Sequence, residues 1–123
     1  MDFANHERRI PVSLVSGAVY ASIQLDPEKQ IMQWLREDLL ELTLKNRASG
    51  VVLDVSGITM LDGDAFHHLV DTTRMLQLVG ATTIVVGLRP GIVAGLCELN
   101  VDLCALHGSS NVTQALEMLH GRA

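Results

Sequence analysis

The chain has 123 residues and a formal net charge of −5 at neutral pH, and 48% of its residues are hydrophobic but only 3% aromatic. This length suits one domain with a core of its own. The charge gives no bulk attraction to nucleic acid, few aromatic side chains are available to stack on bases, and the apolar runs are too short to cross a membrane.

The ends and the cysteines add little chemistry. Residues 1–9 are polar and lack the apolar stretch of a secretory signal, which predicts a flexible lead on a cytoplasmic protein. Residues 10–121 are expected to form a single domain. Cys97 and Cys104 lack C-x-x-C spacing, so we interpret them as reduced, partly buried thiols.

Two short alternating runs open the domain. Residues 10–15 and 18–25 alternate apolar with small or polar side chains, and Ser16 and Gly17 lie between them. This pattern predicts a β-hairpin. Pro11 removes a hydrogen-bond donor, which places the first strand at the edge of a sheet.

A long amphipathic helix is predicted next. Asp26, Pro27 and Glu28 form a helix start, with an acidic N-cap and Pro at the first helical position. Apolar residues then recur every three or four positions from Ile31 to Leu42. The helix is expected to end near Asn46.

The central stretch predicts a strand, a loop and a helix. Residues 51–55 are a short apolar run rich in β-branched residues, typical of a strand buried on both faces. Asp62 can cap a helix over residues 63–78. The loop therefore lies at the carboxyl end of a parallel strand, where functional sites of open α/β sheets are found.

The remaining elements continue the alternation. We predict a strand at 82–86, a short helix at 92–99, a weak strand at 103–107, and a last helix that begins with the capping pair Asn111 and Gln114. The order is ββαβαβαβα. It predicts an α/β fold with an N-terminal hairpin, a mostly parallel sheet and four helices.

None of the catalytic motifs considered is complete in this sequence. The chain has no glycine-rich phosphate loop, and a triad from Ser56, His67 or His68 and Asp62 lacks a nucleophile elbow. Adjacent histidines on a helix point about 100° apart and cannot chelate one metal. Asp54 resembles the acceptor of a receiver domain, but the acid pair and lysine that receivers need are missing. We predict no enzyme activity, no metal and no cofactor.

Residues 54–62, Asp-Val-Ser-Gly-Ile-Thr-Met-Leu-Asp, closely resemble the signature of the STAS family, the sulfate-transporter and anti-sigma-factor-antagonist domains. Residues 10–12, 21–25 and 35–39 are similar to the stand-alone S subunit of the stressosome, the RsbS-like branch. The Gly-Leu-Arg-Pro loop at 87–90 matches one shared by the S and R paralogues. The resemblance covers nearly the whole chain and implies a STAS (SpoIIAA-like) fold.

The resemblance also implies a function. It predicts a stressosome scaffold or an anti-sigma factor antagonist that works through protein contacts in signal transduction and the stress response. Its partners would be a serine/threonine switch kinase or an anti-sigma factor, STAS paralogues, and further copies of itself. The alternative is a small-ligand module that binds an anion or nucleotide at the helix starts near Gly63 and Gly91.

One departure from the family pattern concerns regulation. The position after Asp62, where the family carries a phosphoacceptor Ser, is Gly63, which has no hydroxyl. Residues 94–97, near a second acceptor Thr of the R paralogues, hold no Ser or Thr either. Asp64 is open to two interpretations: a permanent partial mimic of a phosphate, or a carboxylate that simply suits the helix dipole.

The predicted contact surface follows from the loop and the helix start. An exposed Leu or Met is expected to act as the apolar anchor, with acidic side chains as a polar rim. The candidate partner-binding residues are Ser56, Ile58, Met60, Asp62, Gly63, Asp64, Phe66 and Arg89.

Overall fold

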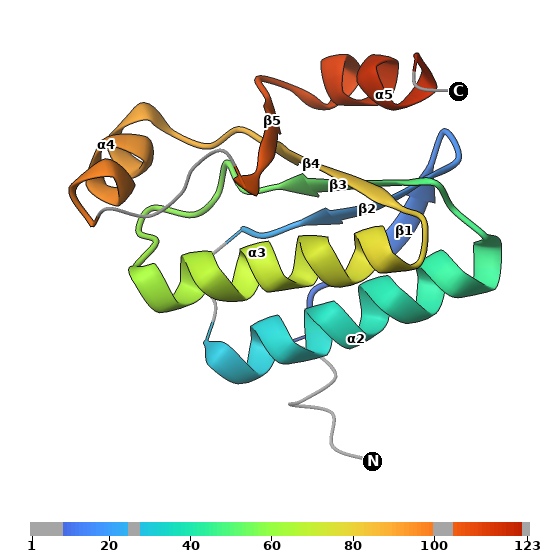
Figure 1. Cartoon of the computed structure of the whole chain (residues 1–123), viewed down its shortest axis with the longest axis horizontal. Coiled ribbons are helices and arrows are strands. Elements are labelled where there is room, and N and C mark those ends of the chain that lie inside the picture. The colour runs from blue at the N-terminus through green and yellow to red at the C-terminus, as the bar shows by residue number, and fades with distance from the viewer. Residues whose placement is uncertain (1–8, 25–27, 100–104, 122–123) are drawn as a thin grey trace.

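A five-stranded sheet forms the centre of the protein, and its strands lie side by side in sequence order (Figure 1). The computed structural model describes residues 9–24, 28–99 and 105–121. The strands are β1 (Val12–Val15), β2 (Ala18–Ser22), β3 (Gly50–Asp54), β4 (Thr82–Val86) and β5 (His107–Ser109). β1 is antiparallel to β2, and the other pairs are parallel. The predicted mostly parallel sheet with an antiparallel edge is confirmed.

The hairpin turn explains the sharp reversal between β1 and β2. Ser16 has φ 50° and Gly17 has φ 83°, so both residues adopt the left-handed conformation. Such two-residue turns match the right-handed twist of the flanking strands. β1 lies at the edge of the sheet as predicted, and it begins at Val12, directly after Pro11, instead of at residue 10.

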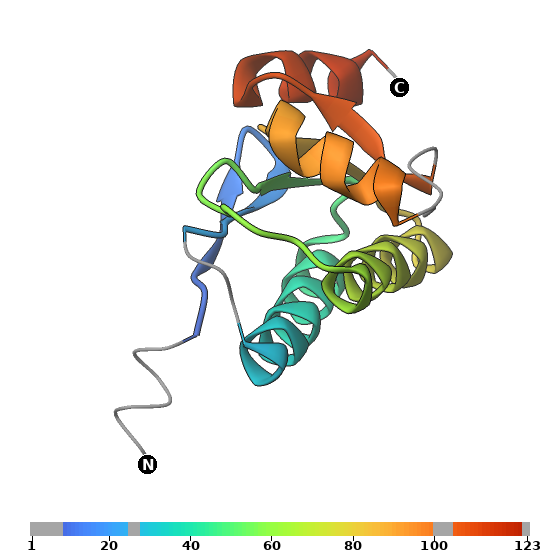
Figure 2. The same ribbon diagram turned by 90° about the vertical axis from the view of Figure 1, so that its left-hand side faces the viewer.

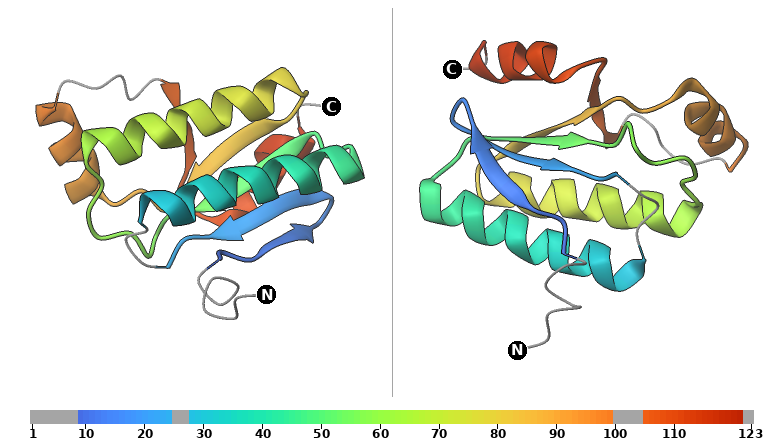
Figure 3. Two further views of the ribbon diagram at one scale, coloured as in Figure 1. Left: turned by 90° about the horizontal axis from the view of Figure 1, so that it is seen from below. Right: turned by 180° about the vertical axis from the view of Figure 1, so that it is seen from behind.

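Helices cover the sheet unequally. Helices α2 (Lys29–Asn46) and α3 (Gly63–Leu78) lie side by side on one face, and the short α5 (Val112–His120) lies on the other (Figures 1 and 3). Figure 2 shows α4 (Pro90–Glu98) in front of the end of the sheet, beside the loop between β3 and α3. In the described ranges no helix is long and apolar enough to span a bilayer.

The core has two parts because β3 is buried on both faces. Val51 and Leu53 belong to the larger cluster with α2 and α3, and Val52 belongs to the smaller cluster under α5. All three side chains are fully buried. This arrangement confirms the interpretation of the continuous apolar run as a two-sided strand.

Several predicted boundaries are wrong. Helix α2 begins at Lys29, and Glu28 precedes it without a side-chain cap; the predicted cap at Asp26 lies outside the described residues. Helix α4 begins at Pro90 instead of residue 92, because Pro suits the first helical position. β5 is His107–Ser109 instead of 103–107, of which residues 103 and 104 lie outside the described ranges.

The last helix starts as predicted. The Asn111 side chain accepts a hydrogen bond from the backbone N–H of Gln114 at 2.8 Å. The Gln114 side-chain oxygen in turn accepts from the N–H of Ser110 at 3.2 Å, one residue earlier than in the standard box. Both contacts satisfy backbone N–H donors at the start of α5, the helix described on the face of the sheet opposite α2 and α3.

Arg9 is held by the domain, although it falls in the segment predicted to be flexible. Its guanidinium donates two hydrogen bonds to the Asp38 carboxylate, at 2.7 and 3.2 Å. It also lies over the Trp34 ring, 5.2 Å from the ring centroid. The bond to Asp38 raises the pKa of Arg9, against a smaller opposing effect of burial. Arg9 is therefore bound to α2 through Asp38 and Trp34.

Candidate functional site

The loop after β3 is folded tightly on itself. The Asp54 carboxylate accepts hydrogen bonds from the Ser56 N–H at 2.9 Å and the Ser56 hydroxyl at 2.7 Å. The N–H of Ile58 then donates to the carbonyl of Val55 at 3.0 Å. Asp and Ser favour such local turns because their side chains reach neighbouring backbone groups.

Two glycines let this loop approach its neighbours. A Cβ on Gly57 would lie 2.5 Å from the Cα of Gln24, and a Cβ on Gly87 would lie 2.8 Å from the Cβ of Ser56. Gly87 also has φ +78°, a conformation that favours glycine. The loop is therefore packed against backbone on both sides.

Arg89 joins the loop to the start of α4. Its Nε and Nη2 atoms donate to the Ser56 carbonyl at 3.1 and 2.9 Å. A charged bidentate donor gives a well-defined geometry even at an exposed site. Ser56 and Arg89, which the sequence proposed separately, thus lie in direct contact.

The start of α3 is capped as the sequence predicts. The Asp62 carboxylate accepts from the N–H of Ala65 at 2.8 Å. Gly63 is the first helical residue, and a Cβ there would meet no heavy atom within 4 Å. Asp64 in the first turn adds a negative charge at the positive end of the helix dipole.

Two hollows flank the start of α3. The loop hollow, of about 280 Å³, lies against α4 and is lined by Thr59, Met60, Leu61, Arg89, Gly91, Ile92 and Gly95. The acidic hollow, of about 540 Å³, lies between α2 and α3 and is lined by Lys29, Met32, Asp62, Asp64, Ala65, His67, His68 and Asp71. Four of the predicted contact residues are thus divided between the two hollows, Met60 and Arg89 in one and Asp62 and Asp64 in the other.

Two of the predicted contact residues are corrected by their burial. Ile58 is 2% exposed and Phe66 is 1% exposed, because both side chains pack into the core between the sheet and α2 and α3. These two side chains therefore hold the loop and the start of α3 onto the core instead of contacting a partner. Met60 is 72% exposed, and Ser56, Asp62, Asp64 and Arg89 are exposed as well.

The acidic hollow was not predicted as a unit. Lys29 and Asp71 are far apart in the sequence and share this hollow only because α2 packs beside α3. Arg36 joins the two helices, since its Nη2 donates to the His68 carbonyl at 3.2 Å and its Nε to the Thr72 hydroxyl at 3.0 Å. Arg36, a charged residue on the predicted amphipathic helix, was the sequence signal that could have indicated this contact between α2 and α3.

His68 is the titratable group most affected by this packing. Its Nδ1 atom is buried and has no hydrogen-bond partner. Burial lowers the pKa of His68 from its ordinary value of 6.5, Arg36 and Lys29 lower it further, and Asp71 opposes them. His68 therefore favours its neutral form in the folded protein.

Metal chemistry finds no support in the described part of the chain. No group of three or more His, Cys, Asp or Glu side chains is placed there to hold an ion. Cys97 is an exposed free thiol rather than a partly buried one, and Cys104 lies outside the described residues. What the site offers is a fixed loop, two shallow hollows and an exposed Met.

The family of the chain follows from its fold and from comparison with known proteins. The model of the STAS domain matches residues 16–107. This match covers most of the chain, so the protein belongs to the STAS domain family.

One relative and two solved structures illustrate the match. RsbT co-antagonist protein RsbRA from Bacillus subtilis is 32% identical over 82 residues, which are 67% of this chain and 28% of that protein. A structure of RsbS from Moorella thermoacetica has a TM-score of 0.78 and 23% identity, covering 93% of this chain and 97% of that one. A chain in a structure of the stressosome, described as a signal integration and transduction hub, has a TM-score of 0.74 and 22% identity. The match covers 91% of this chain and 97% of that one. The chain thus spans less than a third of the length of RsbRA, and the two structures share its fold.

The first prediction concerns the glycine that allows the loop to pack. We expect Gly57→Ala to lower the free energy of unfolding by about 1–3 kcal/mol, because the new Cβ would overlap the Gln24 backbone. Urea denaturation measures the change. Gly63→Ala is the matched control, since its Cβ meets open space; its effect should stay below about 1 kcal/mol. Equal effects of the two substitutions would contradict the packing argument.

The second prediction concerns pH. Because the pKa of His68 is lower in the folded than in the unfolded protein, the unfolded state binds protons first as pH falls. Stability should therefore be complete above about pH 6.5 and decline as the pH drops from there towards the folded pKa. His68→Gln should flatten this decline, measured by thermal unfolding from pH 7.5 to 5.5, and His67→Gln, on the exposed neighbour, should not.

Proposed function

We propose that this protein is a non-catalytic STAS protein that acts through protein–protein contacts, as a stressosome scaffold or an anti-sigma factor antagonist. The observation that carries the proposal is the exposure of Met60, 72%, on a loop held by backbone packing and by Arg89. A loop held in this way loses little backbone entropy on binding, and Met side chains are enriched at protein interfaces.

The proposed partners come from the similarity to stressosome proteins. They are STAS paralogues, further copies of this chain, and a serine/threonine switch kinase or an anti-sigma factor. RsbRA and RsbRB, two similar proteins from Bacillus subtilis, are both named RsbT co-antagonist proteins. We expect the protein to act in the cytoplasm, with no membrane or nucleic acid involved.

The contact surface is proposed to centre on the loop hollow. Met60 supplies the apolar anchor, and Arg89 lines the same hollow. Asp62 and Asp64 supply an acidic rim on the other side of the α3 start. Apolar centres with polar rims are typical of protein interfaces.

We propose further that this surface cannot be switched by phosphorylation at Gly63. Phosphoryl transfer to a side chain needs a hydroxyl, which glycine lacks. The open space around its missing Cβ leaves room for the Ser of the family pattern, so sterics do not explain the glycine. Asp64 then either mimics the phosphate in part or serves only the helix dipole.

The alternative of an anion or nucleotide at the helix starts has less support. Asp62 places its own carboxylate on the free N–H groups of α3, and Asp64 adds a second negative charge there. At α4, the Arg89 guanidinium already donates to Ser56. At α3 the position of the predicted anion is thus taken by the Asp62 carboxylate, and at α4 the guanidinium nearest the helix start is already bonded within the chain.

The third prediction tests the contact surface. We expect Met60→Lys to weaken binding to a co-expressed STAS paralogue or switch kinase at least about tenfold, because it puts a charge on the apolar anchor. Binding is measured by analytical ultracentrifugation of the purified pair. Leu44→Lys is the matched control: Leu44 is 55% exposed at the far end of α2 and should bind like wild type. Equal binding by wild type and Met60→Lys would refute the surface.

The fourth prediction tests the blank regulatory position. With a switch kinase and labelled ATP, we expect Gly63→Ser to take up phosphate and wild type to take up none at the α3 start. Gly91→Ser is the control, because its side chain also meets open space at a helix start but lies on α4. Labelling of Gly91→Ser to the same extent would show that the kinase recognises no specific site.

Asp64 can be tested in the same binding assay. If Asp64 acts as a partial phosphate mimic, Asp64→Ala should change affinity for the kinase by several-fold, and Asp71→Ala, a neighbouring acid on the same helix, should not. Unchanged binding by Asp64→Ala would leave only the dipole role.

A further inference from the structure

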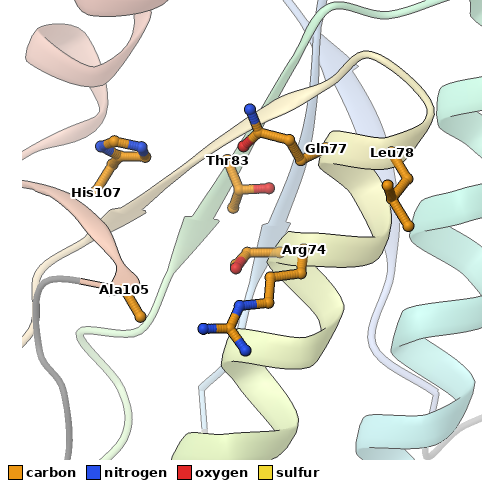
Figure 4. Close-up of a pocket in the computed structure, with 7 residues that line it drawn as sticks. Arg74, Gln77, Leu78, Thr83, Ala105 and His107 are labelled. Carbon is orange, nitrogen blue, oxygen red and sulfur yellow. The ribbon is translucent and has the colours of Figure 1, made fainter.

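A third hollow lies at the edge of the sheet, on the C-terminal half of α3. It has a volume of about 410 Å³ and is lined by Thr73, Arg74, Gln77, Leu78, Thr83, Ala105 and His107. Figure 4 shows side chains from α3, β4 and β5 arranged around it. β5 pairs with β4 only from Ile84 onwards, so this short last strand leaves Thr83 without a β5 partner.

Thr83 is the unusual residue in this hollow. It is 4% exposed, and its hydroxyl has no hydrogen-bond partner. In Figure 4 the hydroxyl points from β4 towards α3. A buried hydroxyl without a partner is unfavourable, so a ligand atom that reaches it would be bound more tightly than at an ordinary surface.

The charges around the hollow select the kind of ligand. Among the lining residues that the structure describes none is acidic, although the protein carries a net charge of −5. Arg74 is exposed and forms no ion pair within the described residues. The salt bridge seen there joins Arg9 to Asp38. A guanidinium matches a carboxylate in geometry and charge.

The rest of the lining suits a ligand with an apolar body. Ala105 offers an apolar surface, Leu78 is a solvent-exposed apolar side chain at its edge, and the Gln77 amide and the His107 ring add polar groups. The volume falls in the range of small-molecule sites.

We propose that this hollow binds a small organic carboxylate, with its carboxylate on Arg74 and the Thr83 hydroxyl and its apolar body against Ala105. The site is separate from the proposed protein contact surface, which lies at the other end of α3. It is also separate from the helix starts at Gly63 and Gly91.

The experiment uses benzoate as the probe. Benzoate is titrated into the full-length ¹⁵N-labelled protein, and amide shifts are followed by NMR. We expect saturable shifts at Arg74, Gln77, Thr83 and His107, and none with benzamide, which has the same shape but no charge. Arg74→Gln and Thr83→Val should each weaken benzoate binding at least about tenfold, whereas Thr83→Ser, which keeps the hydroxyl, should bind like wild type.

Matched controls separate binding from folding. Thr43 is also a buried threonine, 1% exposed, with an unpartnered hydroxyl, but it lies on α2 and lines none of the three hollows described. Thr43→Val should leave benzoate binding unchanged, as should Lys45→Gln, an exposed cation of α2. Thermal unfolding of each variant confirms that it is folded.

Several outcomes would overturn the proposal. Equal shifts with benzoate and benzamide, or shifts at the hollow that do not saturate, would do so. Benzoate binding by Arg74→Gln and Thr83→Val equal to that of wild type would do so as well. Inorganic phosphate is titrated in parallel. If it binds at least as tightly as benzoate, the hollow is a site for phosphate rather than for an organic carboxylate.

Discussion

The position of β3 between β2 and β4 is the constraint on which the structure depends. β3 pairs in parallel with both neighbours and is covered on both faces, so its end points are fixed by hydrogen bonds and by packing. The chain must leave β3 at Asp54 and enter α3 at Gly63 within a short loop. The position of this loop at the carboxyl edge of the sheet is a direct consequence.

Contacts on several sides hold the first half of the loop in place. Gly57 brings it against the Gln24 backbone, Gly87 against Ser56, and Arg89 ties the Ser56 carbonyl to the start of α4. Ile58 anchors it in the core. With these contacts in place, Met60 is displayed to solvent on a defined support, which is the arrangement that a protein-binding surface requires.

Helix α3 connects the two surfaces proposed for this protein. Its first turn lies between the loop hollow and the acidic hollow, and its last turns form a wall of the hollow at β4 and β5. Arg36 fixes α3 to α2 between the two ends. Each surface draws on residues from separate elements, and neither would exist if α3 packed elsewhere.

The sequence by itself determined the element order, the two-faced burial of β3, the capping by Asp62 and Asn111, and the STAS family, because these depend on local pattern and spacing. It misplaced β5 and the start of α2, where the local signals are weak. Only the tertiary structure decided that Ile58 and Phe66 are core residues and that Arg9 is bound by Asp38. It also decided that the Thr83 hydroxyl has no hydrogen-bond partner and that Thr83 lines the same hollow as Arg74. The physical reason is that burial and hydrogen-bond pairing depend on which distant segments meet, and no short stretch of sequence contains that information.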